Sequence, residues 1–116
     1  MRGRPIRLGA SSMFQSLEHR SSGTVLLIRM ADGQRVLRLE NLGNQNGPDL
    51  RVYLLAKPAS SVWHGYDRDY VDLGALRGNL GNQNYAVPDA LDLGHYRSAV
   101  IWCRRFRVGF ALARLY

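Results

Sequence analysis

The sequence has little cysteine, little lysine and no long apolar run. Its single cysteine, Cys103, excludes a disulfide within the chain and any zinc or iron–sulfur site built from several cysteines. Apolar runs are short, as at 25–28, and none approaches the roughly 20 residues of a membrane-spanning helix. The basic start of the sequence is not followed by an apolar segment, so we expect no signal peptide.

Acidic residues are also in deficit. The chain carries 16 basic and 9 acidic residues, for a net charge of +7, and Lys57 is its one lysine. We interpret the arginine excess as a bias of genome composition and the charge as a soluble basic surface. Nucleic acid, anionic lipid or an acidic partner would also suit that charge, but no RNP-type or helix-turn-helix signature indicates nucleic acid. Arginines near the start form a basic tail, residues 1–12, ahead of a single domain, residues 13–116.

Helical patterning is absent as well. No stretch repeats apolar residues every 3.6 positions between caps; instead, Gly, Pro, Asn and Asp turn signals separate short stretches rich in β-branched and alternating residues. This pattern predicts an all-β fold, an antiparallel β-sandwich or flattened barrel of about eight to ten short strands. The expected strands are residues 12–18, 24–30, 34–42, 50–55, 70–76, 82–87, 96–103 and 106–115.

Two local patterns give more specific expectations. The Asp32-Gly33 pair predicts a hairpin with a type I′ turn, which needs positive φ at both central residues. In the first expected strand, Met13, Gln15 and Leu17 would share one face, because side chains alternate along a strand.

One short repeat is visible. Leu-Gly-Asn-Gln-Asn occurs at 42–46 and again at 80–84. It marks either two related β-units or a coincidence between two turn-rich loops. Solenoid and propeller folds need at least three such units, so the repeat does not change the predicted fold class.

The stretch 98–112 holds the cysteine, one of the two tryptophans and the densest arginine cluster. A strand period of two places Cys103 and Trp102 on opposite faces. Arg104 and Arg105 follow directly, and nearby guanidinium groups favour the thiolate, the nucleophilic and metal-binding form of cysteine. Cys103 is therefore either a reactive thiolate or haem ligand, or a small buried hydrophobe, which is common for free cysteine. A disulfide between chains would need an exposed sulfur, against which the aromatic flanks argue.

The histidines, acidic residues and aromatic residues give weaker indications of a site. The histidines His19, His64 and His95 would supply a second haem ligand or a base, but we interpret them as surface or turn residues. The acidic run at 67–72 matches no calcium loop, and no metal-ligand spacing is present. Aromatic residues on strands would stack on a flat ligand or pack as core and cross-strand pairs. No hydrolase motif is present, so we expect no catalytic activity of the domain's own.

The motifs taken in order resemble a known family. They are Ser-Gly-Thr-Val at 22–25, Leu-Arg-Leu-Glu at 37–40, Gly-Pro-Asp-Leu-Arg-Val-Tyr-Leu at 47–54, Asp-Leu-Gly-Ala-Leu-Arg-Gly-Asn at 72–79, Gly-Asn-Gln-Asn-Tyr at 81–85 with Pro88, and Val-Ile-Trp-Cys at 100–103 through Phe106 and Phe110. This series resembles the DM-thirteen domain, an electron-transfer module first noted in Skeletor-type proteins. The resemblance covers nearly the whole chain. It implies a small β-domain that is extracellular, periplasmic or membrane-facing and that, in animals, accompanies cytochrome-like and DOMON modules.

The resemblance also implies a function and a site. The family's single cysteine, matched here by Cys103, is held to act in redox chemistry as a bare thiol or to hold a prosthetic group such as haem. Cys103 is then the candidate catalytic residue, and Cys103, Trp102, Arg104 and Arg105 are the candidate cofactor-binding residues. The expected partner is a redox protein or a cytochrome-like module. The alternative is a non-catalytic binding module at a cell surface, in which the cysteine is structural and the loops carry recognition.

Overall fold

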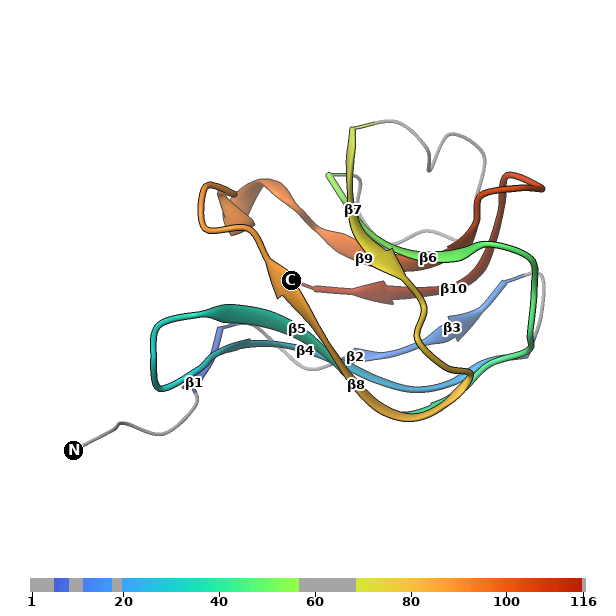
Figure 1. Ribbon diagram of the computed structural model, residues 1–116, viewed down its shortest axis with the longest axis horizontal. Helices are drawn as coiled ribbons and strands as arrows, with labels where there is room; N and C mark the ends of the chain where they lie inside the picture. The colour runs from blue at the N-terminus through green and yellow to red at the C-terminus, as the bar shows by residue number, and fades with distance from the viewer. Residues whose placement is uncertain (1–5, 9–11, 18–19, 57–68, 116) are drawn as a thin grey trace.

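The computed structural model describes residues 6–8, 12–17, 20–56 and 69–115. These residues form ten strands in two antiparallel sheets that face each other as an open sandwich (Figure 1). The strands are β1 (Ile6–Arg7), β2 (Ser12–Met13), β3 (Gln15–Ser16), β4 (Ser22–Arg29), β5 (Arg35–Gly43), β6 (Leu50–Leu55), β7 (Tyr70–Ala75), β8 (Leu80–Val87), β9 (Ser98–Cys103) and β10 (Val108–Arg114). Within the described ranges the one helical segment is a short 3₁₀ turn, η1 (Leu93–His95). The prediction of an all-β antiparallel sandwich is confirmed.

Each sheet joins segments that are distant in the sequence. The first sheet has the order β1-β4-β5-β8, with β2 also paired to β4, and the second has the order β3-β10-β9-β6-β7. The cysteine-bearing strand β9 therefore lies in the middle of the second sheet, between β10 and β6. All 6 residues of β9 are buried. A strand that is covered on both faces usually has an almost continuous apolar sequence, which explains the composition of β9.

The main core fills the space between the two sheets. Alternate residues of β4 and β5, such as Leu27 and Leu39, belong to the same buried cluster as Ile101 of β9. A second, smaller cluster lies on the outer face of the second sheet and consists of Tyr53, Leu55, Val100, Trp102 and Leu112. Because side chains alternate along β6 and β9, neighbouring residues of these strands enter different clusters.

The prediction of one strand at 12–18 with a shared face is wrong. β2 pairs with β4 in the first sheet, whereas β3 pairs with β10 in the second, so the chain crosses between sheets at Phe14. The crossing turns Phe14 into the core, at 7% exposure, and leaves Met13 74% exposed. It also breaks the period of two, so that Met13, Gln15 and Leu17 do not share a buried face.

The hairpin predicted at Asp32-Gly33 exists, but its turn is not type I′. Gly33 has a φ of +91°, whereas Asp32 is not among the described residues with positive φ. The Gly33 amide donates to the Met30 carbonyl at 2.9 Å, and the Met30 amide donates to the Gln34 carbonyl at 2.7 Å. The connection is therefore a three-residue loop that ends in a left-handed glycine, which is the next most common hairpin geometry. The Asp32 carboxylate accepts from the Gln34 amide at 2.9 Å and fixes the turn from the side.

The two copies of the five-residue repeat lie side by side but differ in environment. Leu42 pairs with Gly81 and Gly43 pairs with Leu80, because β5 and β8 are antiparallel neighbours. Leu42 is buried, whereas Leu80 is exposed. The copies run in opposite directions and bury different residues, which favours coincidence over two related units.

Candidate functional site

The two faces of β9 separate the predicted site residues. Cys103 lies on the inner face with Ala99 and Ile101, in the cluster between the sheets. Trp102 lies on the outer face with Val100. The alternation predicted from the sequence is therefore confirmed, and it places the thiol and the indole on opposite sides of the second sheet.

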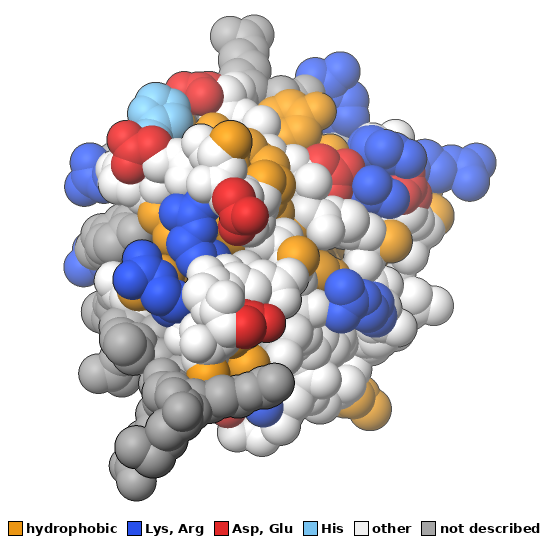
Figure 2. Space-filling view, turned by 60° about the vertical axis from the view of Figure 1, so that its left-hand side comes forward, with side chains coloured by type: hydrophobic (Ala, Val, Ile, Leu, Met, Phe, Trp, Pro, Cys, Tyr) orange, Lys and Arg blue, Asp and Glu red, His pale blue; other side chains and the backbone are white. Residues whose placement is uncertain are grey.

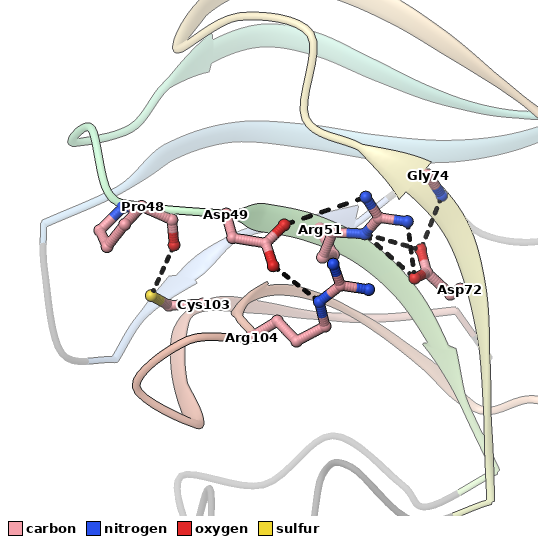
Figure 3. A network of polar contacts seen from close by, with 7 residues as sticks. All are labelled: Pro48, Asp49, Arg51, Asp72, Gly74, Cys103 and Arg104. Carbon is pink, nitrogen blue, oxygen red and sulfur yellow. Dashed lines mark hydrogen bonds and ion pairs between the residues drawn. The ribbon is translucent and has the colours of Figure 1, made fainter.

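Cys103 is a free cysteine whose side chain is completely buried, at 0% exposure. Its Sγ–H donates to the Pro48 carbonyl oxygen at 3.1 Å (Figure 3). Across the sheet it pairs with Leu50 of β6 and Val108 of β10. The sulfur is thus a small core group with a satisfied weak donor, as buried free cysteines commonly are.

The arginines after Cys103 form the tip of the β9–β10 hairpin, and each is exposed. The Arg104 Nε donates to the Asp49 Oδ2 at 2.6 Å, and the Arg104 amide donates to the Asp49 carbonyl at 3.1 Å. The hydrogen bond and charge of Asp49 raise the pKa of Arg104. The Arg105 guanidinium lies 6.0 Å from the centre of the Phe106 ring. Arg104 therefore meets a carboxylate, and Arg105 an aromatic ring at the tip.

The Arg104–Asp49 contact belongs to a longer polar network across β6 and β7. Arg51 Nη2 lies 2.9 Å from Asp72 Oδ2, and Arg51 Nη1 lies 3.9 Å from Asp49 Oδ1. Asp72 Oδ1 also accepts from the Gly74 amide at 2.8 Å. Figure 3 shows these groups in series beside β6, with the Cys103 sulfur directed towards Pro48 at one end. The network holds the hairpin tip and β7 against the same strand.

On the outer face of the second sheet, three aromatic rings lie in a row across β7, β6 and β9. The Tyr70 and Tyr53 ring centres are 4.3 Å apart with planes inclined by 15°, and the Tyr53 and Trp102 ring centres are 6.3 Å apart with planes inclined by 26°. Tyr70 is 41% exposed, whereas Tyr53 and Trp102 are only 1% and 2% exposed. We call Tyr70, Tyr53 and Trp102 the aromatic row. Offset-parallel rings at such distances attract one another beyond the area that they bury.

The aromatic row lines a small recess together with Arg104 and Arg107. Its volume is about 170 Å³. Burial raises the pKa of Tyr53 to about 12, with smaller contributions from Tyr70 and Asp72. The phenol of Tyr53 therefore remains protonated at neutral pH. Arg107 has a φ of +57°, which turns the hairpin so that its last residue borders this face.

A larger hollow of about 680 Å³ lies elsewhere, between the β4–β5 turn and the end of β8. It is lined by 32–34 and 86–89. The nearby Arg35 guanidinium donates to the carbonyls of Pro88 and Leu91 at 2.6 and 2.8 Å, so it closes a loop. Because the lining brings no titratable or aromatic groups together beyond two aspartates, the smaller recess is the better candidate site.

Of the four candidate cofactor-binding residues, the recess contains Trp102 and Arg104. Cys103 lies on the other side of the strand, and Arg105 is not among the lining residues of the recess. Tyr53 and Tyr70 were visible in the sequence as strand aromatics, but nothing in the sequence showed that β6 would separate β7 from β9.

The titratable groups considered for metal or haem binding do not converge. His95 Nε2 pairs with Asp69 Oδ2 at 3.3 Å, and both side chains are more than half exposed. His19, His64 and Asp67 lie outside the described residues. In the part of the chain that the structure describes, no group of three or more His, Cys, Asp or Glu side chains could hold a metal ion.

The positive charge does not gather into one patch on the face that Figure 2 shows, where basic and acidic side chains are interspersed with apolar ones. Among the described residues, no helix is long and apolar enough to cross a membrane. No curated protein and no solved structure matches the chain significantly. A family model, Electron transfer DM13, matches residues 13–115. The single buried cysteine, the all-β sandwich and this match over nearly the whole chain lead to one conclusion: the protein belongs to the DM13 family of electron-transfer domains.

Proposed function

We propose that this domain is an accessory module of electron transfer in which Cys103 is a bare, sheltered thiol and not a haem ligand. The closure around the sulfur carries this proposal: the side chain has no exposed surface, and its Sγ–H donates to the Pro48 carbonyl. A haem iron bound by that sulfur would need a deprotonated thiol with open space beside it. A hydrogen-bonded thiol among packed side chains does not fit that requirement.

The thiol in this position supports the fold around the recess. Cys103 ends β9, and Pro48 lies just before β6, so the contact ties the turn at 47–49 to the central strands. The same turn presents Asp49 to Arg104. Burial also protects the sulfur, because oxidation of a cysteine follows its thiolate character and its exposure. Cys103 is then a structural residue of an electron-transfer domain.

The recess offers a contact surface for a redox partner. At about 170 Å³ it is smaller than the roughly 300–1,000 Å³ of most ligand pockets, so a side chain or the edge of a partner's cofactor suits it better than an enclosed porphyrin. The net charge of the chain, +7, favours a partner with an acidic surface around its redox centre, because complementary charge speeds and orients docking. Trp102 and Arg104 are then partner-contacting residues.

Haem titration tests the first part of the proposal. The visible spectrum of the purified protein is recorded with increasing haem, beside that of a Cys103→Ser variant. We expect the two spectra to match, because no thiolate is available to the iron. A haem band that the wild type shows and the variant lacks would refute the proposal.

Alkylation of the thiol tests the second part. The rate at which iodoacetamide modifies Cys103 is measured for the folded protein and for the protein in denaturant. We expect slow modification of the folded protein and rapid modification of the unfolded one, because the sulfur is sealed. Modification of the folded protein at the rate of an unfolded cysteine would show that the thiol is accessible after all.

A further inference from the structure

We propose that the aromatic row is an electron path that leads from the protein surface at Tyr70, across Tyr53, to the buried indole of Trp102. The inference rests on the proposed function, because it supplies a route for electrons that needs neither a bound cofactor nor an accessible sulfur. Phenol and indole are the aromatic side chains that give up an electron most readily, and the row contains no other ring type.

The geometry suits this path in two respects. Tyr53 stacks on Tyr70 with ring centres 4.3 Å apart and on Trp102 with ring centres 6.3 Å apart, so both steps along the row are short. The exposure falls from 41% at Tyr70 to 2% at Trp102. One end of the row can therefore release a proton to water, while the other is shielded from small oxidants in solution.

The recess places the exposed end of the row where a partner would dock. Tyr70, Tyr53 and Trp102 all line it, beside Arg104 and Arg107. A purely structural row would need only apolar contact, and cross-strand aromatic pairs often serve that purpose. Here the rings border a hollow whose lining includes two arginines, and Trp102 directly precedes Cys103 in the chain.

The reaction balances with a high-potential one-electron oxidant as the partner centre. The oxidant, docked at the recess, takes one electron from the Trp102 indole that lines it and leaves the indole as a radical cation. An electron from Tyr70 then passes across the Tyr53 ring to Trp102, and the exposed Tyr70 phenol releases its proton to water. The oxidant is reduced by one electron, Trp102 is restored and Tyr70 is left as a neutral radical. Tyr53 bridges the two rings and keeps its proton throughout.

Photo-oxidation tests the path with a ruthenium(III) tris-bipyridine complex, generated by a flash and a quencher, as the oxidant. The parent protein is a Trp63→Phe variant, which leaves Trp102 as the one tryptophan of the two in the sequence. The tryptophan radical is followed by transient absorption. We expect Tyr70→Phe to slow the decay of the Trp102 radical about tenfold or more, because no phenol at that position then supplies the electron. A tenfold change corresponds to about 1.4 kcal/mol of added barrier.

Matched variants separate the path from its alternatives. Tyr53→Phe keeps the stacked ring and should leave the decay rate of the Trp102 radical nearly unchanged, whereas Tyr53→Leu removes the ring and should slow the decay as Tyr70→Phe does. Tyr96→Phe changes a tyrosine that contacts His95 and not the row, and it should have no effect. Circular dichroism verifies that each variant is folded, and Tyr70→Phe should fold because its ring remains.

The path is refuted if the Trp102 radical decays as fast in Tyr70→Phe as in the parent, or if Tyr96→Phe slows the decay equally. Such a result would leave the assignment of Cys103 intact, because the haem and alkylation experiments do not involve the row. Conversely, a haem band that depends on Cys103 would refute that assignment without changing the photo-oxidation result.

Discussion

Replacing Cys103 by Ala measures how far the thiol is a structural group. The variant removes one buried heavy atom, whose transfer from water is worth about 0.8 kcal/mol if it is taken as equal to one methylene. The space left behind, about the size of a methyl group, adds about 0.6 kcal/mol at roughly 24 cal/mol per Å³. Loss of the Sγ–H bond to Pro48 adds about 0.5 kcal/mol. We therefore expect the free energy of unfolding to fall by about 2 kcal/mol.

Urea denaturation under reducing conditions measures this change, and a thermal scan should show a fall in Tm of about 8 °C for a domain of this size. Cys103→Ser is the matched control, because its hydroxyl can still donate to the Pro48 carbonyl. It should lose only about 1 kcal/mol, the cost of a more polar buried group. If Cys103→Ala were as stable as the wild type, the sulfur would not be packed as the structure has it, and the argument for a structural thiol would fail.

Three other substitutions follow from the same structure. Phe14→Ala should lower the free energy of unfolding, measured in urea, by about 3–5 kcal/mol, since Phe14 is buried where the chain crosses between sheets. The control Met13→Ala, at an exposed neighbour, should change it by less than about 0.5 kcal/mol. Equal effects of the two substitutions would contradict the crossing. Asp72→Asn should cost about 1 kcal/mol, because it weakens the contacts to Arg51 and to the turn at Gly74; an unchanged urea midpoint would count against that network. The pKa of Tyr53, raised from 10.0 to about 12, lies above its unfolded value, so its contribution is complete below pH 10 and is lost as the pH rises towards 12. The free energy of unfolding should therefore fall by up to about 3 kcal/mol through this group as the pH rises from 10 to 12. Tyr53→Phe should remove that part of the pH dependence. An identical pH profile for the variant would show that another group is responsible.

The sequence was a good guide wherever local alternation decides the outcome. The opposite faces of Trp102 and Cys103 follow from a period of two and were predicted correctly. Turn chemistry was a weaker guide, because Asp-Gly suits both a type I′ turn and a three-residue loop that ends in glycine, and the structure has the second.

The composition of the recess could not be predicted from the sequence. It depends on the strand order β3-β10-β9-β6-β7, which brings Tyr53 between Tyr70 and Trp102 although the three are far apart in the chain. The same applies to Arg104, which adjoins Cys103 in sequence and yet contacts Asp49, because the chain reverses directly after the strand. Nearness in sequence predicted an arginine beside the sulfur, but the direction of a side chain at a hairpin depends on the residues across from it.

The short segment from β2 to β3 links the two sheets. Its first half pairs with β4 and its second half with β10, so a stretch of five residues forms backbone hydrogen bonds with both layers of the sandwich. A chain shortened to begin at residue 20 would leave β4 and β10 with open backbone groups along those edges. Bare edges of this kind recruit strands from other molecules, so the trimmed protein should self-associate although most of its buried core would remain.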